Sequence, residues 1–136
     1  MSNRRPLSMS DYRTLARFRR ALRAFLRFSE DAARAAGLTP AQHQLLLAIK
    51  GHPNDAAPSA SDVADALQLR LHSAVGLIGR AEAAGLVVRH PDPVDARRHL
   101  LSLTPLGVER LEGLSRQHRA ELRDFADMMN VLRALD

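Results

Sequence analysis

The residues of this sequence best suited to chemistry lie on one face of a predicted helix. Apolar residues recur at helical spacing from about residue 71 to Gly85, and the opposite face is small or polar at its start and cationic further along. The side chains concerned are Arg70, His72, Ser73, Gly76 and Arg80. Polar groups at a helix start can reach base edges, a glycine permits close approach, and a later guanidinium can contact a phosphate. This pattern indicates hydrogen bonding to the major groove and backbone of a nucleic acid.

A second cluster of charged residues lies in the loop between two short apolar runs. Leu86–His90 and His99–Leu103 have strand character, and the residues between them are too polar and proline-rich to be buried. That loop carries Asp95, Arg97 and Arg98. An acid beside arginines can orient a guanidinium toward a phosphate or a narrow groove. The alternative is a solvated hairpin turn with no partner.

Helices must position both groups. The spacing predicts an amphipathic helix from Tyr12 to near Gly37, then helices over about 40–50 and 60–66 before the one at 71. Thr39 with Gln42, and Ser59 with Asp62, have the spacing of capping boxes. In the helix from 71, we expect one apolar face to be buried: Leu71, Ala74, Val75, Ile78 and Ala81.

The C-terminal segment opens with Thr104-Pro105, a hydroxyl cap followed by a first-turn proline. Its apolar spacing fits one long helix or two helices broken around residues 116–119. Because the sequence stops at Asp136, we expect the last helix to be short.

Composition limits the classes of function. The 136 residues include no cysteine, which excludes disulfides, thiolate catalysis and cysteine-based metal sites. No apolar run approaches the roughly 20 residues of a membrane span, and no apolar stretch follows the Arg4-Arg5 pair as a signal peptide requires. We expect neither export nor membrane insertion, but a single domain in the cytoplasm.

The net charge of +5 is unevenly distributed, since residues 1–34 hold nine arginines and three acids. Such a basic segment indicates contact with phosphates or a membrane surface, or it is an arginine-rich, solvated helix face.

Signs of catalysis and of metal binding are weak. The sequence has no Gly-x-Ser-x-Gly elbow, no His-Glu-x-x-His pair and no glycine-rich phosphate loop. His90 and His99 lie on the two predicted strands and could face each other, but histidines near DNA phosphates explain them better than a metal does. We predict no catalytic residue, no metal and no cofactor.

Several segments carry a wider pattern that covers about residues 12 to 125. They are Leu38–Gln42, Ser61–Ala64, His72–Val75, Ala83–Val87, and Asp92–Arg98 followed by Leu103–Gly107. Together they resemble the MarR family of bacterial transcriptional regulators, and the last two segments are the most specific. Gln68 departs from the pattern, because many members carry glycine there.

The resemblance implies a mainly α fold with a small β-hairpin wing, that is, a winged helix-turn-helix domain with dimerisation helices at both ends. The chain would divide into an N-terminal helix (1–37), a DNA-binding domain (38–104) and C-terminal dimerisation helices (105–136). A homodimer would bind a pseudo-palindromic operator in double-stranded DNA. Arg97 would enter the minor groove, Asp95 would pair with it or with Arg98, and Arg98 would face the backbone.

Many proteins of this kind release DNA when a small aromatic or phenolic acid binds between the dimer helices and the winged domain. Arg23, Arg27 and His43 could meet such an anion here, or could be purely structural. Our main hypothesis is a ligand-responsive repressor. The alternative is a protein-interaction or surface-binding module that keeps the fold and docks its basic helix on an acidic partner.

Overall fold

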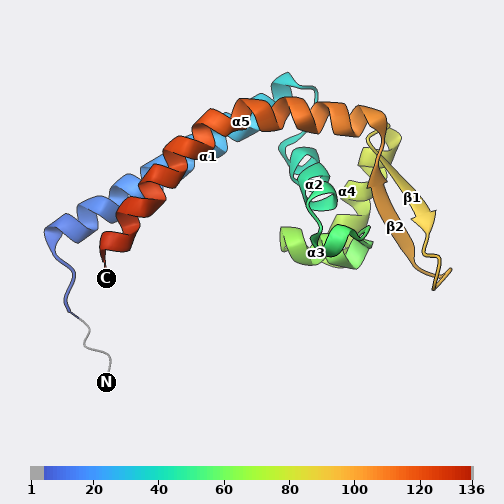
Figure 1. The fold of residues 1–136 in the computed structure, drawn as a ribbon, viewed down its shortest axis with the longest axis horizontal. Helices are drawn as coiled ribbons and strands as arrows, with labels where there is room; N and C mark the ends of the chain where they lie inside the picture. Colours follow the sequence, from blue (N-terminus) through green and yellow to red (C-terminus); the bar gives the residue numbers. More distant parts are fainter. Residues whose placement is uncertain (1–4, 136) are drawn as a thin grey trace.

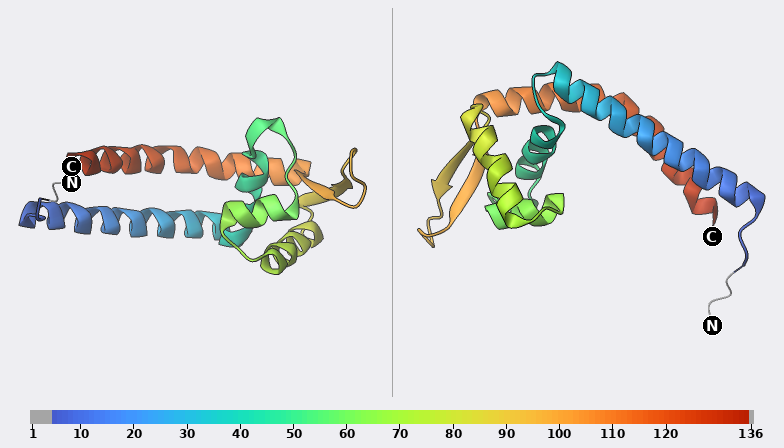
Figure 2. Two further views of the ribbon diagram at one scale, coloured as in Figure 1. Left: turned by 90° about the horizontal axis from the view of Figure 1, so that it is seen from below. Right: turned by 180° about the vertical axis from the view of Figure 1, so that it is seen from behind.

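Two long helices lie side by side as an arm that leads away from a smaller body of helices and a β-hairpin (Figures 1 and 2). The computed structural model describes residues 5–135; Arg4 of the basic pair, the other residues of 1–4, and Asp136 lie outside them. The elements are α1 (Met9–Ala35), α2 (Pro40–Lys50), η1 (Pro53–Asp55), α3 (Ala60–Leu67), α4 (Leu71–Ala83), β1 (Val87–Pro91), β2 (His99–Leu103), α5 (Pro105–Leu132) and η2 (Arg133–Leu135). The predicted mainly α fold with a hairpin wing is confirmed.

The arm consists of α1 and the C-terminal half of α5, which run antiparallel (Figure 2). Phe125 of α5 stacks on Phe25 with ring centroids 5.3 Å apart and lies 6.1 Å from Phe18. Aromatic pairs at such separations contribute about 0.5–1.5 kcal/mol beyond their burial. α5 is one continuous helix of 28 residues. The expectation of a short last helix was therefore wrong, because residues 116–119 are polar but include no helix breaker, and His118 is buried in line with Leu111 and Leu114.

Hydroxyl caps begin four of the five α-helices. In α2, the Thr39 hydroxyl accepts from the backbone N–H of Gln42, and the Gln42 side chain accepts from the backbone N–H of Thr39, at 3.1 and 3.0 Å. Ser59 with Asp62 and Ser8 with Asp11 make the same exchange, and Thr104 caps α5 through the N–H of Gly107. A cap of this kind contributes about 1 kcal/mol. The predicted caps at Thr39, Ser59 and Thr104 are confirmed, whereas the one at Ser8 was not predicted.

The turn between α3 and α4 passes through a left-handed residue. Gln68 ends α3 with φ 55° and ψ 44°. A side chain in this conformation costs roughly 1 kcal/mol or more, which glycine avoids. Gln68 thus adopts the left-handed turn geometry that a glycine would adopt with less strain.

The core of the body lies where α2, α3 and α4 meet β2 and the start of α5. Its largest fully buried side chains are Leu45, Leu46, Val63, Ile78 and Leu114. Arg110 of α5 also reaches the end of α1, where its Nη1 donates to the carbonyl of Ala36 at 2.6 Å. The body and the arm therefore share one short junction.

The buried face of α4 differs from the predicted one. Ala74, Ile78 and Ala81 are buried as expected, but Leu71 and Val75 are 52% and 41% exposed. The stripe that packs on the core runs through Leu77 instead, so Leu71 and Val75 lie beside it and face the hairpin.

β1 and β2 form a two-stranded antiparallel hairpin in which Val87 opposes Leu103 and His90 opposes Leu100. The strands match the predicted runs to within one residue. His99 opposes Pro91, so His90 and His99 lie on opposite faces of the sheet. The expectation that these two histidines could face each other was wrong.

Candidate nucleic-acid interface

The polar face predicted for α4 is present and open to solvent. His72, Ser73 and Arg80 are exposed, and Gly76 is half-buried between them. A Cβ built on Gly76 would lie 3.3 Å from Nη1 of Arg80, so the guanidinium folds back over the glycine. Arg70 is the N-cap of α4 and makes no side-chain cap bond. The start of α4 is thus a surface with free donors.

The loop between β1 and β2 is held by its own polar groups. The backbone N–H of Asp92 donates to the carbonyl of Arg98 at 2.8 Å, and the N–H of Arg98 donates to the carbonyl of Asp95 at 2.9 Å. The Asp95 carboxylate accepts from the backbone and from Nε of Arg97, at 3.1 and 3.3 Å. The Arg97 side chain is 93% exposed. The loop therefore presents Arg97 at its tip with its carboxylate partner beside it.

Arg98 is anchored to the body rather than to Asp95. Its Nη2 donates to Oδ2 of Asp62 on α3 at 3.2 Å. The same oxygen accepts from the backbone N–H and the hydroxyl of Ser59, at 2.9 and 3.0 Å. The backbone N–H of Ser59 is the main cause that lowers the pKa of Asp62, with further lowering by the Ser59 hydroxyl, His52 and Arg98, while partial burial opposes it. Asp62 is consequently an anion that ties the hairpin to α3.

Sequence reasoning identified Asp62 only as a capping residue. Its bond to Arg98 spans 36 positions of sequence, and no local pattern signals it. A second unforeseen bond joins the hairpin to α4, since Nε of Arg89 donates to Glu82 at 2.6 Å. Both bonds fix the angle between the hairpin and the helices.

Between α3, α4 and the hairpin lies a hollow of about 540 Å³. Leu71 and Val75 line it from α4, opposite Arg89, Arg98 and His99 of the hairpin. The two apolar residues that the core does not bury thus line a cleft whose arginines are paired with acids, Arg98 with Asp62 and Arg89 with Glu82.

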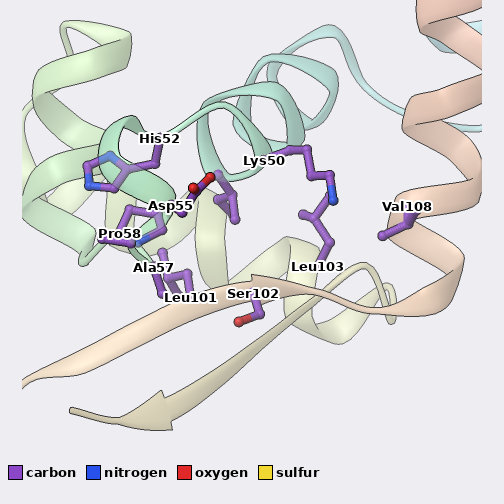
Figure 3. Close-up of a pocket in the computed structure, with 11 residues that line it drawn as sticks. Lys50, His52, Asp55, Ala57, Pro58, Leu101, Ser102, Leu103 and Val108 are labelled. Atoms are coloured by element: carbon purple, nitrogen blue, oxygen red, sulfur yellow. The ribbon is translucent and has the colours of Figure 1, made fainter. Parts of the chain in front are cut away.

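A second cavity, of about 360 Å³, lies behind β2 (Figure 3). Leu101 and Leu103 of β2 form one side, and Lys50, His52 and Asp55 reach it from the end of α2 and the loop that follows (Figure 3). None of the residues predicted to bind DNA or an effector lines this cavity.

The three residues suggested for an effector site are not brought together. Arg23 and Arg27 are exposed on α1, whereas His43 is buried at the junction, 5% exposed, against His118 of α5. A different hollow, of about 350 Å³, lies between α2 and α5. Leu47 and Leu111 give it apolar walls, and its cations are Lys50, Arg116 and Arg119.

A helix-turn-helix whose second helix opens a polar face beside a hairpin with an arginine at its tip defines the winged helix-turn-helix class of proteins. Residues 36–98 match the sequence model of the MarR family. This stretch of the chain, from the end of α1 to the hairpin loop, is similar to the MarR family.

Individual relatives agree with this assignment. The chain is 31% identical over 103 residues to a protein of Thauera aromatica whose name assigns it provisionally to regulation of the hcr operon. That alignment covers 76% of this chain, and the chain spans only 60% of the length of this curated relative.

Solved structures show the same fold. BpsR of Bordetella bronchiseptica, described with the regulation of its DNA binding by 6-hydroxynicotinic acid, is 25% identical with a TM-score of 0.64, over 85% of this chain and 92% of its own. AbsC of Streptomyces coelicolor, a MarR family transcriptional regulator, is 23% identical with a TM-score of 0.73, over 98% and 94% of the two chains. Among the helices of residues 5–135, none has the length and apolar character needed to cross a membrane.

Proposed function

We propose that this protein is a transcriptional regulator that binds specific sequences of double-stranded DNA. The observation that carries the proposal is the exposed Arg97 at the tip of a hairpin whose orientation is fixed by the Arg98–Asp62 bond, beside the open polar face of α4. A narrow minor groove attracts an inserted arginine, and polar side chains at a helix start suit the major groove. Arg70, His72 and Ser73 are the proposed base contacts, and Arg80 is the proposed phosphate contact.

The acting unit in this proposal is a homodimer. The arm leaves large apolar side chains exposed on both of its helices: Tyr12, Leu26, Leu122, Met129 and Val131. A second arm would bury them, and two-fold symmetry would then place the two α4 helices about one DNA turn, 34 Å, apart. The operator would accordingly be a pseudo-palindrome.

We further propose that a small aromatic acid releases the protein from DNA, so that it acts as a repressor. Support comes from BpsR, whose DNA binding is regulated by 6-hydroxynicotinic acid. In this chain the hollow between α2 and α5 combines apolar walls from Leu47 and Leu111 with Lys50, Arg119 and Arg116, the last of which pairs with Glu112 at 3.7 Å, so that a net positive charge faces an aromatic carboxylate. It is a better site than one built from Arg23, Arg27 and His43. The protein would act in the cytoplasm, by binding alone and without catalysis.

Fluorescence anisotropy on DNA from upstream of the gene and on a scrambled duplex of the same composition, each at two salt concentrations, tests the proposal. A specific regulator binds the native fragment about a thousandfold more tightly than the scrambled one. Equal, weak and strongly salt-dependent binding to both would contradict specific recognition and favour the alternative, a surface-binding module that uses its arginine-rich α1. Addition of 6-hydroxynicotinic acid to the specific complex tests the effector separately.

A further inference from the structure

A pair of buried histidines lies at the junction of the body and the arm. His43 belongs to α2 and His118 to α5, and they are 5% and 6% exposed. Their ring centroids are 5.1 Å apart. The two rings lie in the junction at which α2 also packs on α1 and α5.

The hydrogen bonds of the pair are incomplete. Nδ1 of His118 lies 2.6 Å from the carbonyl of Leu114, and because a carbonyl only accepts, this nitrogen carries the proton. Nε2 of His118 and Nδ1 of His43 are both buried without a partner. Each ring therefore has at least one buried nitrogen without a hydrogen bond.

The surroundings offer no counter-charge. From α1, Phe25 and Phe28 present their rings to His118, with centroids 6.1 and 5.2 Å from the imidazole. In residues 5–135, no acidic side chain forms an ion pair or hydrogen bond with either histidine. The nearby charged groups are Lys50 on α2 and Arg119 on α5, both at the hollow between those helices, and Glu121 on α5, in the groove beside Phe25.

We propose that the His43–His118 contact is a proton-sensitive joint, and that protonation of His43 loosens the packing of α5 and the arm against α2. A charged imidazole here would lose its hydration and gain no acceptor, whereas exposure restores water to it.

The direction of the effect follows from burial. Burial is the main cause that lowers the pKa of His43, and a charge on His118 lowers it further. The packed state thus binds fewer protons than the open state between the depressed pKa and the ordinary value of 6.5. The joint is fully stable above pH 6.5 and weakens as the pH falls below that value.

The first test is thermal unfolding at pH 7.5 and pH 5.0, at one protein concentration and without DNA. His43→Phe keeps a ring in place but cannot be protonated, and His99→Gln removes an exposed histidine as a control. We expect the midpoint of the wild type and of His99→Gln to fall by about 3–6 °C more than that of His43→Phe, the size expected for one ionisable group in a domain of this length. Equal pH dependence in all three proteins would overturn the proposal.

A second measurement needs no variant. In the wild type, NMR titration of the imidazole Cε1–H signals, with hydrogen exchange of α2 and α5 amides, should show His43 taking up its proton together with loss of amide protection around residues 43 and 118. Titration of His43 with unchanged protection would overturn the proposal. If His43→Phe does not fold, His43→Gln takes its place in the unfolding experiment.

The consequence for DNA rests on the proposed function and is measured apart from these tests. If the protein binds an operator, the affinity of the wild type should fall more steeply between pH 7.5 and pH 5.5 than that of His43→Phe. If it binds no operator, the unfolding and NMR experiments still decide whether the joint senses protons.

Discussion

Arg98 at the end of the wing loop and Asp62 in the first turn of α3 are joined by a 3.2 Å hydrogen bond across 36 positions of sequence. Asp62 also accepts two hydrogen bonds from Ser59, and these bonds hold its carboxylate in place independently of Arg98. The cap of one helix therefore also serves as the anchor of the wing. Asp62 can in this way set the position of the wing loop that carries Arg97, the proposed DNA contact.

This arrangement predicts that Asp62 and Arg98 are coupled. Asp62→Asn and Arg98→Ala should each loosen the loop, and the double variant should be less destabilised than the sum, by about 0.2–1 kcal/mol as for other partly exposed ion pairs. Urea unfolding of the four proteins measures this coupling. A DNA-binding assay compares Asp62→Asn with Asp65→Asn, an exposed substitution on the same helix. Asp62→Asn should weaken binding, and Asp65→Asn should leave it unchanged. Additive effects in both assays would show that the bond does not position the wing.

Arg97 should contribute to affinity without contributing to stability. Its side chain is 93% exposed and bonds only Asp95 among the described residues. Arg97→Ala should weaken operator binding by about 1–3 kcal/mol, the range for a lost groove contact, and leave the unfolding curve in place. Val94→Ser, at a residue 96% exposed in the same loop, is the matched control and should change neither quantity. Unchanged DNA affinity of Arg97→Ala would show that the loop is a solvated turn without a role in DNA binding.

Different residues on the polar face of α4 should determine sequence specificity and the overall affinity for DNA. Substitution of His72 or Ser73 should change which operator sequence is preferred. Arg80→Ala should instead weaken binding to all duplexes alike and reduce the slope of log K against log salt by about one. Anisotropy titrations on a set of single-base operator variants, at several salt concentrations, distinguish the two effects. Equal losses on every duplex for all three substitutions would disprove the assignment of base contacts.

Two glycines of α5 should respond to alanine with opposite signs. A Cβ on Gly107 would clash with the carbonyl oxygen of Leu86, so Gly107→Ala forces α5 away from the residue before β1 and should cost about 1–3 kcal/mol. Gly113 has open space around its Cα, and Gly113→Ala should stabilise the helix by about 0.5–1 kcal/mol. Urea unfolding at a fixed protein concentration compares them. A neutral Gly107→Ala would mean that the start of α5 is not packed closely on the backbone of Leu86.

Acid should weaken the anchor of the wing. The backbone N–H of Ser59 holds the pKa of Asp62 below 3.8, and that of Ser8 does the same for Asp11. Because the folded pKa is depressed, the carboxylates stabilise the fold above pH 3.8, and this contribution is lost as the pH falls below it. The stability of the wild type should therefore fall more steeply below pH 4 than that of Asp62→Asn, as followed by circular dichroism. Parallel curves for the two proteins would contradict this.

Local patterns allowed much of the fold to be predicted. The caps at Thr39, Ser59 and Thr104 use partners within three residues, so their chemistry is visible in the sequence. The polar face of α4 also follows from periodicity. Periodicity does not show where a neighbouring element ends, however, and Leu71 and Val75 were assigned to the core because the cleft beside the hairpin could not be foreseen.

Contacts between distant segments were beyond such reasoning. His43 looked available to a ligand because nothing in α2 indicates His118, 75 positions further along, as its neighbour. Arg23 and Arg27 carry the charge that an acid would need, but helical spacing alone does not show which element lies opposite them. In each case the missing information is the packing of α5 on α1 and α2.

The arm is long relative to the junction that holds it to the body. Its 27-residue α1 extends about 40 Å, so a tilt of about 5° at the junction displaces the far end by 3–4 Å, close to the rise of one base pair. If a second copy of the chain binds the far end of the arm, the same tilt changes the distance between the bodies of the two copies. The angular stiffness at Arg110, Ala36 and the paired histidines, rather than the recognition surface itself, would then determine how much variation in half-site spacing the protein tolerates.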